Sequence, residues 1–110
     1  MASRNKFHAI KTTIGDITFD SKREARRWQE LKLLERAGEI SRLERQVKFP
    51  LTVEGHLIAN YTADFQYYTA SPKARVVEDV KGGGTLKLPA FVLKKKLMKA
   101  IYGIELLVTQ

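Results

Sequence analysis

Two short stretches of the sequence combine acidic and basic side chains in a spacing that suits chemistry. VVEDVKGGG, residues 76–84, contains Asp79 and Lys81, and NYTADFQYY, residues 60–68, contains Asp64. Both stretches are rich in residues that favour strands, in which successive side chains point to opposite faces. Asp79 and Lys81 therefore share a face, and Asp64 lies beside them if the two strands pair as a hairpin.

This group of side chains predicts a site that hydrolyses a phosphodiester. Two close carboxylates repel each other unless a cation lies between them, and Mg²⁺ prefers one or two carboxylates together with water and phosphate oxygens. A lysine beside the ion can orient or deprotonate a water molecule and offset the charge on a pentavalent phosphorus. The alternative is that Asp79 and Lys81 only decorate the solvent face of a hairpin, and the D-x-K spacing alone favours this alternative.

A third carboxylate, Glu24, lies near the start of a helix predicted from Ser21 to about Ala37. Ser21 and Glu24 fit the capping-box pattern S-x-x-E, so Glu24 has a possible role as a helix cap. At about 100° per residue, however, it falls between Trp28 and Leu31 on the apolar side, which directs it toward the sheet. Metal ligand and cap remain equally open, and the two roles are compatible. The expected apolar arc comprises Ala25, Trp28, Leu31, Leu34 and Ala37.

The elements that must position these residues follow from hydrophobic periodicity and turn residues. A basic arm and a small hairpin around Gly15-Asp16 occupy residues 1–20. Further strands are predicted at Arg45–Val53, Leu57–Tyr68, Ala74–Lys81 and Ile104–Thr109, and a second helix from Pro89 to about Tyr102. The second helix should bury Leu93, Leu97, Ala100 and Ile101, and alternation in the Leu57–Tyr68 strand should place Tyr61, Ala63, Phe65 and Tyr67 on one face. The expected fold is α/β, one domain over residues 1–110, with a mixed, mainly antiparallel sheet flanked by two helices in the order helix–strand–strand–strand–helix–strand.

The charge of the chain indicates nucleic acid as a partner. Twenty Lys and Arg stand against twelve Asp and Glu, which gives a formal net charge of +8 and a pI near 9.9. A domain as basic as this is typical of nucleic-acid binding, although a basic protein kept soluble by repulsion is the alternative. There is no cysteine, which excludes disulfides and cysteine-ligated zinc. Without a membrane-length apolar run or an apolar leader, we expect a cytoplasmic protein with no membrane partner.

The combined pattern resembles the PD-(D/E)XK nuclease superfamily. Asp64 is followed on the next strand by Asp79-Val80-Lys81, with Glu24 on a preceding helix and a further helix after the lysine. The stretches KFHAIKT, ITFDSKREARRW, ERQVKFPL, ADFQYY, VVEDVKG and LKKKLM resemble a family of small phage- and prophage-encoded proteins of unassigned function. The layout is also similar to that of Holliday-junction resolvases, which implies a restriction-endonuclease-like core. Residue 63 is Ala where the superfamily name has proline, a residue that shapes the strand and does no chemistry.

The resemblance implies roles for individual residues. Asp64 and Asp79 would bind Mg²⁺ or Mn²⁺ together with the carbonyl of Val80, and Lys81 would position or activate the attacking water. Glu24 would be a further ligand or would orient that water. Glu78 competes with Asp79 for the ligand role, but only Asp79 has the D-x-K spacing and shares a face with Lys81. The candidate DNA contacts are Gln46, Lys48, Lys94, Arg23 and Arg27, with Arg4, Lys6 and Lys11 of the arm.

These features predict a metal-dependent endodeoxyribonuclease without an organic cofactor. The resemblance favours branched DNA, such as a Holliday junction in phage recombination or replication, as the substrate. Two matched cuts in a junction would require a homodimer. The alternative functions are a non-catalytic nucleic-acid-binding protein and an accessory subunit of a phage DNA-processing complex.

Overall fold

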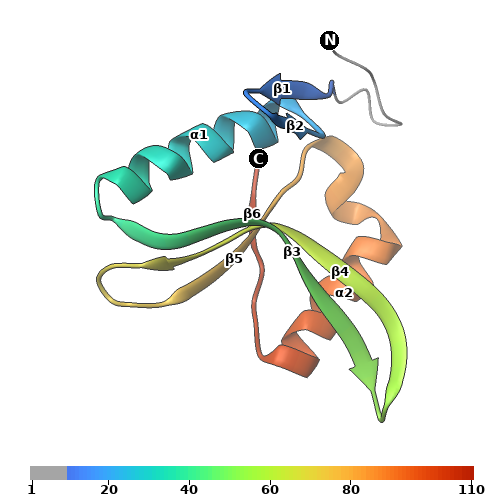
Figure 1. Ribbon diagram of the computed structural model, residues 1–110. Helices are drawn as coiled ribbons and strands as arrows, with labels where there is room; N and C mark the ends of the chain where they lie inside the picture. The colour runs from blue at the N-terminus through green and yellow to red at the C-terminus, as the bar shows by residue number, and fades with distance from the viewer. Residues whose placement is uncertain (1–9) are drawn as a thin grey trace.

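The chain folds into the predicted succession of helices and strands (Figure 1), as seen in a computed structural model that describes residues 10–110. The elements are β1 (Thr12–Ile14), β2 (Ile17–Phe19), α1 (Lys22–Arg36), β3 (Ile40–Val53), β4 (His56–Thr69), β5 (Arg75–Val80), the 3₁₀ helix η1 (Gly83–Lys87), α2 (Pro89–Tyr102) and β6 (Leu107–Thr109). The α/β class and the order helix–strand–strand–strand–helix–strand are therefore confirmed. In the described part of the chain, no helix has the length and apolar character that crossing a membrane requires.

Four strands form one sheet in the order β3-β4-β5-β6, and β1 and β2 form a separate hairpin. β3 with β4 and β4 with β5 are antiparallel neighbours joined by short turns, whereas β5 and β6 are parallel. A parallel pair needs a long crossover, and α2 provides it between β5 and β6. The predicted mixed, mainly antiparallel sheet is confirmed.

The start and end of α1 follow from its capping residues. Ser21 at the N-cap accepts a hydrogen bond at Oγ from the backbone N–H of Glu24 at 3.1 Å, which satisfies one of the donors left free at a helix start. Gly38 follows the last turn with φ of +81°, a backbone conformation that favours glycine and ends helices. Both ends agree with the helix predicted from Ser21 to about Ala37, and the N-terminal cap fixes where Glu24 lies.

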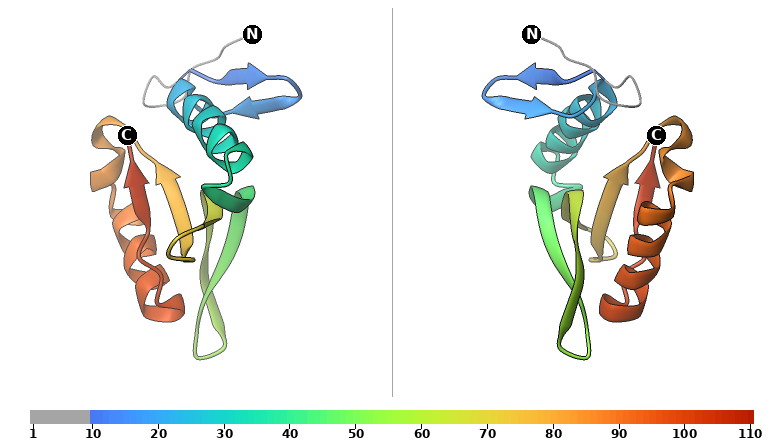
Figure 2. Two further views of the ribbon diagram at one scale, coloured as in Figure 1. Left: turned by 90° about the vertical axis from the view of Figure 1, so that its left-hand side faces the viewer. Right: turned by 90° about the vertical axis from the view of Figure 1, so that its right-hand side faces the viewer.

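The two helices cover opposite sides of the sheet (Figure 2), and each covers its own apolar cluster. Alternation along β5 demonstrates the division, because Val77 belongs to the cluster under α2, whereas Val76 and Val80 pack in the cluster under α1. Phe91 and Met98 come from α2, and Leu31 comes from α1. The two acidic residues of β5 therefore face opposite sides of the sheet: Glu78 faces the α1 side, and Asp79 faces the α2 side.

β3 changes face at Gln46. Leu43 and Val47 are four residues apart and would share a face in a regular strand. Leu43 nevertheless packs in the cluster under α1, and Val47 packs in the cluster under α2. Gln46 has φ of +54°, in the left-handed region that residues other than glycine rarely adopt and that interrupts the alternation.

β4 changes face at the corresponding place, at Asp64, between the paired positions Arg45–Phe65 and Val47–Ala63. The prediction that four residues of β4 share one face is therefore wrong. The structure divides them into Phe65 and Tyr67 under α1 and Tyr61 and Ala63 under α2. The physical reason is a local twist shared by both strands, which the period-two pattern does not encode.

The buried faces of both helices also differ from the prediction. In α1 the apolar arc ends at Leu31, because Leu34 is 37% exposed and Ala37 is exposed. In α2 the prediction is right for Leu97 and Ile101, which pack against the apolar cluster. It is wrong for Leu93, which is 54% exposed, and for Ala100, which is exposed, while Phe91 and Met98 are buried in their place.

Candidate active site

Asp64 and Asp79 meet where β4 and β5 separate. The last residues of the two strands in register are Phe65 and Glu78, so Asp64 and Asp79 occupy the next position along the pair. Asp64 Oδ2 accepts a hydrogen bond from the backbone N–H of Val80 at 2.7 Å. A side-chain carboxylate thus takes the place of a backbone carbonyl at this end of the ladder. The predicted proximity of Asp64 and the Asp79-x-Lys81 pair is present in the structure.

Asp79 is buried, with 1% of the residue exposed, and both of its charged or polar partners approach the same oxygen. Tyr61 donates its hydroxyl to Asp79 Oδ2 at 2.6 Å, and Lys81 Nζ lies 3.4 Å from that oxygen. The Lys81 ammonium also lies 4.9 Å from the centre of the Phe91 ring, a distance typical of a cation–π contact. Lys81 is therefore held between a carboxylate and an aromatic face, at the surface of the site.

Glu24 is a helix cap and a member of the same cluster. It is 3% exposed, and its Oε1 accepts a hydrogen bond from the backbone N–H of Asp20 at 3.2 Å. Its Oε2 accepts a hydrogen bond from Gln46 Nε2 at 3.2 Å. Burial raises the pKa of Glu24, and repulsion from Asp20 and Asp79 raises it further, whereas the hydrogen bond from the Asp20 backbone and the charge of Arg45 lower it. The helix therefore directs Glu24 to the sheet, as predicted, and Gln46 joins the site at its side.

Two carboxyl groups of the site, those of Asp64 and Glu24, have a raised pKa. Burial raises the pKa of Asp64 to about 9, and hydrogen bonding and repulsion from Asp79 and repulsion from Glu24 add to this effect. The hydrogen bond from Val80 acts in the opposite direction but is weaker. Three acids without enough positive charge between them are costly in a buried place. A cation at this point would lower that cost.

The donor chemistry of the site fits Mg²⁺ or Mn²⁺ held by two carboxylates. Such ions take oxygen ligands and usually keep several water molecules, so a complete protein cage is not needed. Among residues 10–110, no group of three or more His, Cys, Asp or Glu side chains forms a ready-made metal site. Both oxygens of Glu24 are engaged by Asp20 and Gln46, which leaves Asp64 and Asp79 as the principal candidates.

Glu78 lies on the opposite side of β5 from Asp79. It is fully buried and accepts two hydrogen bonds from Arg27, at 2.7 Å from Nε and 3.1 Å from Nη2. Tyr67 and Thr109 donate their hydroxyls to it at 2.6 Å and 2.9 Å. The structure thus separates Glu78 from Lys81 and gives it partners of its own.

The residues predicted to contact DNA differ in their exposure and in the groups that they contact. The guanidinium of Arg23 lies against Gly82, since a Cβ atom at position 82 would come within 3.2 Å of its Cζ and Nη1. Arg27 is engaged with Glu78, a structural contact that the sequence did not indicate. Lys48 is exposed on β3, and Lys94 is half-buried on α2. Of the basic residues in the arm, Lys11 is exposed, and Arg4 and Lys6 lie outside the described residues.

Sequence reasoning missed two residues of the site. Tyr61 was expected on the other side of β4, and only the twist at Asp64 brings its hydroxyl to Asp79. Arg45 acts on Glu24 by its charge and stacks its guanidinium 4.9 Å from the centre of the Phe19 ring. The position of Arg45, directly before Gln46 in a basic stretch, was the one signal that could have pointed to it.

Fold and site together define a small α/β protein with a buried carboxylate cluster and one lysine at the end of a mixed sheet. Residues 4–108 match the model of a family described as a protein of unknown function (DUF1064), and the chain belongs to that family. No curated protein and no solved structure matches the chain.

Proposed function

We propose that the protein is a Mg²⁺- or Mn²⁺-dependent endodeoxyribonuclease of the PD-(D/E)XK type. The observation that carries the proposal is the meeting of Asp64, Asp79 and Lys81 where β4 and β5 separate, with Lys81 Nζ 3.4 Å from Asp79. At this place one lysine stands beside two acids, whereas Glu78 on the other side of β5 has an arginine of its own.

Each residue has a role in this proposal. Asp64 and Asp79, with the carbonyl of Val80, would hold the ion, which when bound supplies positive charge beside the scissile phosphate. Lys81 would orient the attacking water or take its proton, and its ammonium would offset charge on the phosphorus. Glu24 would orient water at the edge of the site, from the position in which Gln46 and Asp20 hold it.

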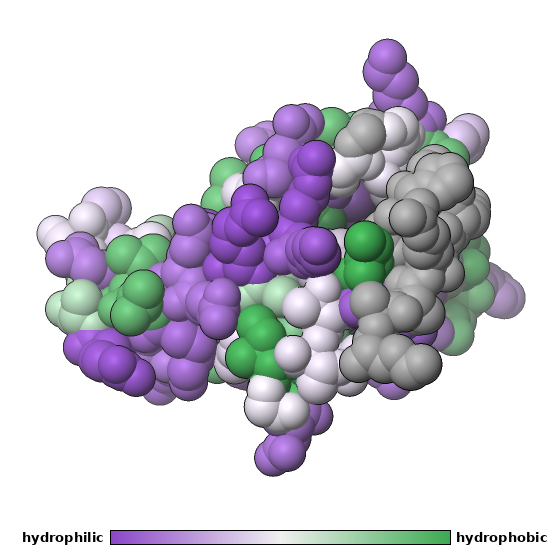
Figure 3. All heavy atoms as spheres, turned by 90° about the horizontal axis from the view of Figure 1, so that it is seen from above, coloured by the Kyte–Doolittle hydropathy of each residue, from purple (hydrophilic) through white to green (hydrophobic). Residues whose placement is uncertain are grey.

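The surroundings of the site suit a polyanion. The face of the molecule seen from above α1 and the β1–β2 hairpin is mostly hydrophilic, with hydrophobic residues in small separate groups (Figure 3). Arg23, which lies beside Gly82, and Gln46, which lies beside Glu24, would contact phosphates that flank the cut, and Lys48 and Lys94 would extend this surface. Arg27 is left out because Glu78 engages it. The net charge of +8 favours DNA along the whole surface.

Branched DNA is the proposed substrate, and a homodimer is the proposed active form. A domain of 110 residues has little surface for reading a base sequence. Selection by DNA structure, as in the junction resolvases that the sequence resembles, therefore fits better than selection by sequence. Resolution of a junction requires two matched cuts, which a dimer with twofold symmetry delivers.

The test is a cleavage assay on a supercoiled plasmid and a synthetic four-way junction. We expect cutting with Mg²⁺ or Mn²⁺ and none with EDTA, and a loss of at least about 100-fold in rate for Asp79→Asn. Asp16→Asn is the matched control, because it removes one acidic charge in the exposed β1–β2 turn. Wild-type protein that binds both DNAs and cuts neither with any divalent ion would make the chain a non-catalytic binding protein. Cutting that begins only when phage proteins are added would make it an accessory subunit.

A further inference from the structure

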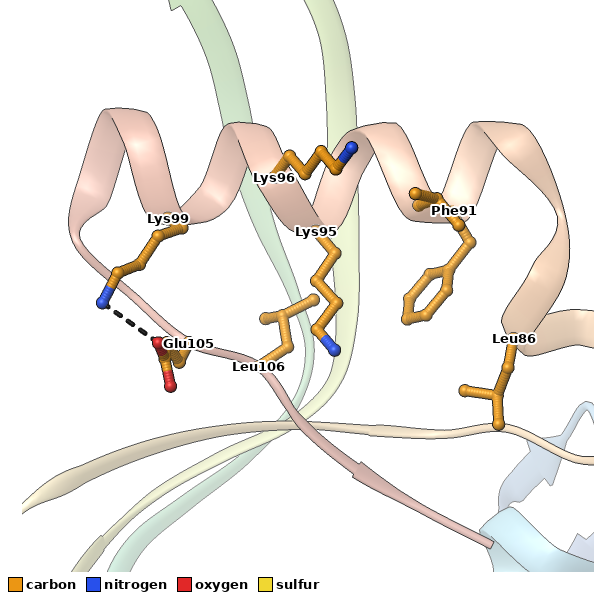
Figure 4. Close-up of a pocket in the computed structure, with 8 residues that line it drawn as sticks. Leu86, Phe91, Lys95, Lys96, Lys99, Glu105 and Leu106 are labelled. Atoms are coloured by element: carbon orange, nitrogen blue, oxygen red, sulfur yellow. Dashed lines mark ion pairs between the residues drawn. The ribbon is translucent and has the colours of Figure 1, made fainter.

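A groove runs between α2 and the chain segment that leads into β6 (Figure 4). It has a volume of about 580 Å³. β6 is the edge strand of the sheet, and within residues 10–110 no further strand pairs with its outer side. The residues that line the groove and carry the argument are Leu86, Phe91, Val92, Leu106, Lys95 and Lys96.

The groove has an apolar floor and a basic rim. Leu86, Phe91 and Leu106 form the floor, and the Lys95 side chain extends along the groove beside Leu106 (Figure 4). Lys99 at one end pairs with Glu105 at 3.2 Å. Lys95 and Lys96 form no ion pair with any acidic residue in the range 10–110. The rim therefore keeps positive charge available for a ligand.

The apolar floor and the basic rim together indicate which kind of ligand the groove would bind. Lysines without acidic partners suit an anionic ligand. An apolar floor suits an aliphatic or aromatic side chain, which loses contact with water when it enters. The DNA backbone supplies negative charge but no apolar group to fill the floor. A protein segment that carries several acidic residues beside an apolar one supplies both.

We propose that the groove between α2 and β6 is the docking site for an acidic peptide segment of a partner protein, with one apolar side chain seated on Leu86, Phe91 and Leu106. The segment lies in the groove with its carboxylates toward Lys95 and Lys96. Val92, which is 37% exposed, forms the outer apolar wall.

The groove shares one side chain with the candidate active site. Phe91 lines the groove, and its ring centre also lies 4.9 Å from Lys81 Nζ. A partner bound in the groove would thus contact one face of the Phe91 side chain, and Lys81 contacts the same ring. The docking site itself does not depend on the nuclease proposal, because peptide binding is measured without cleavage.

The test is fluorescence anisotropy with the labelled peptide Asp-Asp-Asp-Asp-Leu-Phe and the full-length protein. We expect saturable binding tighter than about 1 mM. Two further probes distinguish the contribution of negative charge from that of the apolar side chains. They are the same peptide with Ser-Ser in place of Leu-Phe, and a short single-stranded DNA. The Ser-Ser peptide should bind about tenfold more weakly, because the apolar contribution is lost.

Matched substitutions locate the binding site. Lys95→Glu should weaken peptide binding about three- to fivefold, and Lys73→Glu, the same charge change in the exposed β4–β5 turn, should weaken it less. Val92→Ser should weaken it about fivefold. Leu93→Ser should leave it unchanged, because Leu93 is 54% exposed and does not line the groove.

Several results would overturn the proposal. Absence of saturable binding would do so, as would equal binding of the Leu-Phe and Ser-Ser peptides. Equal effects of Lys95→Glu and Lys73→Glu would show attraction by overall charge alone. If the groove variants weaken DNA binding and leave peptide binding unchanged, the groove is part of a DNA path and the peptide assignment is wrong.

Discussion

Glu78 and Asp79 are neighbours on β5 and both are almost completely buried, yet their surroundings are opposite in kind. Glu78 lies on the α1 side, where Arg27 donates two hydrogen bonds and Tyr67 and Thr109 donate one each. The charge of this carboxylate is matched by a guanidinium, and four donors satisfy its oxygens. Such a pair costs desolvation but is fully compensated.

Asp79 lies on the other side of β5 with far less compensation. Tyr61 donates a hydrogen bond to Asp79 Oδ2, and Lys81 Nζ stands 3.4 Å from the same oxygen. Asp64 and Glu24 lie close by, and Asp79 contributes to the raised pKa of each of them. The comparison shows that burial alone does not identify a functional acid in this fold. The acid whose charge is left incompletely balanced is the better candidate.

The largest expected effect is on stability, when Glu78 is changed. Glu78→Gln leaves the guanidinium of Arg27, which is 25% exposed, without its buried charged partner and with only the exposed Glu30 beside it. Removal of one member of a buried pair costs about 3 kcal/mol in the free energy of unfolding. The measurement is urea denaturation followed by circular dichroism in the presence of EDTA.

Glu30→Gln is the control for this first prediction. Glu30 also pairs with Arg27, at 3.5 Å, but it is 57% exposed, so its loss should cost less than about 1 kcal/mol. Equal losses for the two variants would show that the Arg27–Glu78 contact is not the structural pair described here.

The second prediction concerns the stability of Asp79→Asn, for comparison with Glu78→Gln. In EDTA, Asp79→Asn should unfold at the same urea concentration as wild type or at a slightly higher one, because it removes the buried negative charge that raises the pKa of Asp64 and of Glu24. Addition of Mg²⁺ should stabilise the wild type, by about 2.7 kcal/mol at a hundred times the dissociation constant, and should leave Asp79→Asn almost unchanged. Calorimetric titration of Mg²⁺ gives the dissociation constant independently of any cleavage.

Asp16→Asn serves again as the matched control and should respond to Mg²⁺ like the wild type. If Asp79→Asn destabilised the metal-free protein as strongly as Glu78→Gln, Asp79 would be a structural acid. A Mg²⁺ response that is equal in wild type and Asp79→Asn would place the ion elsewhere.

The sequence was sufficient to predict most of the fold, because its signals are local. Gly15-Asp16 in the first hairpin, Ser21 at the start of α1 and Gly103 at the end of α2 each restrict the backbone directly. The direction of Glu24 also followed from helical period alone, and the structure confirms that it is buried toward the sheet.

The details of the site depend on features that short-range patterns do not encode. The left-handed backbone of Gln46 is rare for a residue of this type, and the resulting twist carries Tyr61 to Asp79. The engagement of Arg27 joins residues 51 positions apart in the chain. Alternation in a regular strand predicted the faces of β5 correctly and those of β4 only in part, since β5 has no such interruption.

The smallest and sharpest prediction compares the two tyrosines that donate to the two neighbouring acids. Tyr61 and Tyr67 are both buried and both donate at 2.6 Å, one to Asp79 and the other to Glu78. Burial, together with the adjacent carboxylate, raises the pKa of each tyrosine, to about 12 for Tyr67, so both hydroxyls remain protonated donors at neutral pH. Tyr61→Phe and Tyr67→Phe should therefore each cost about 1 kcal/mol in the free energy of unfolding.

The two variants should differ in how they affect the candidate site. Loss of the Tyr61 hydroxyl frees Asp79 to rotate and removes the donor that fixes its Oδ2, so Mg²⁺ affinity and cleavage rate should fall by about tenfold. Tyr67→Phe should leave both unchanged, because Arg27 still holds Glu78 and Glu78 faces away from Lys81. A fall in Mg²⁺ affinity for both variants would mean that stability alone controls the site. Unchanged affinity in both would mean that Asp79 is oriented without the help of Tyr61.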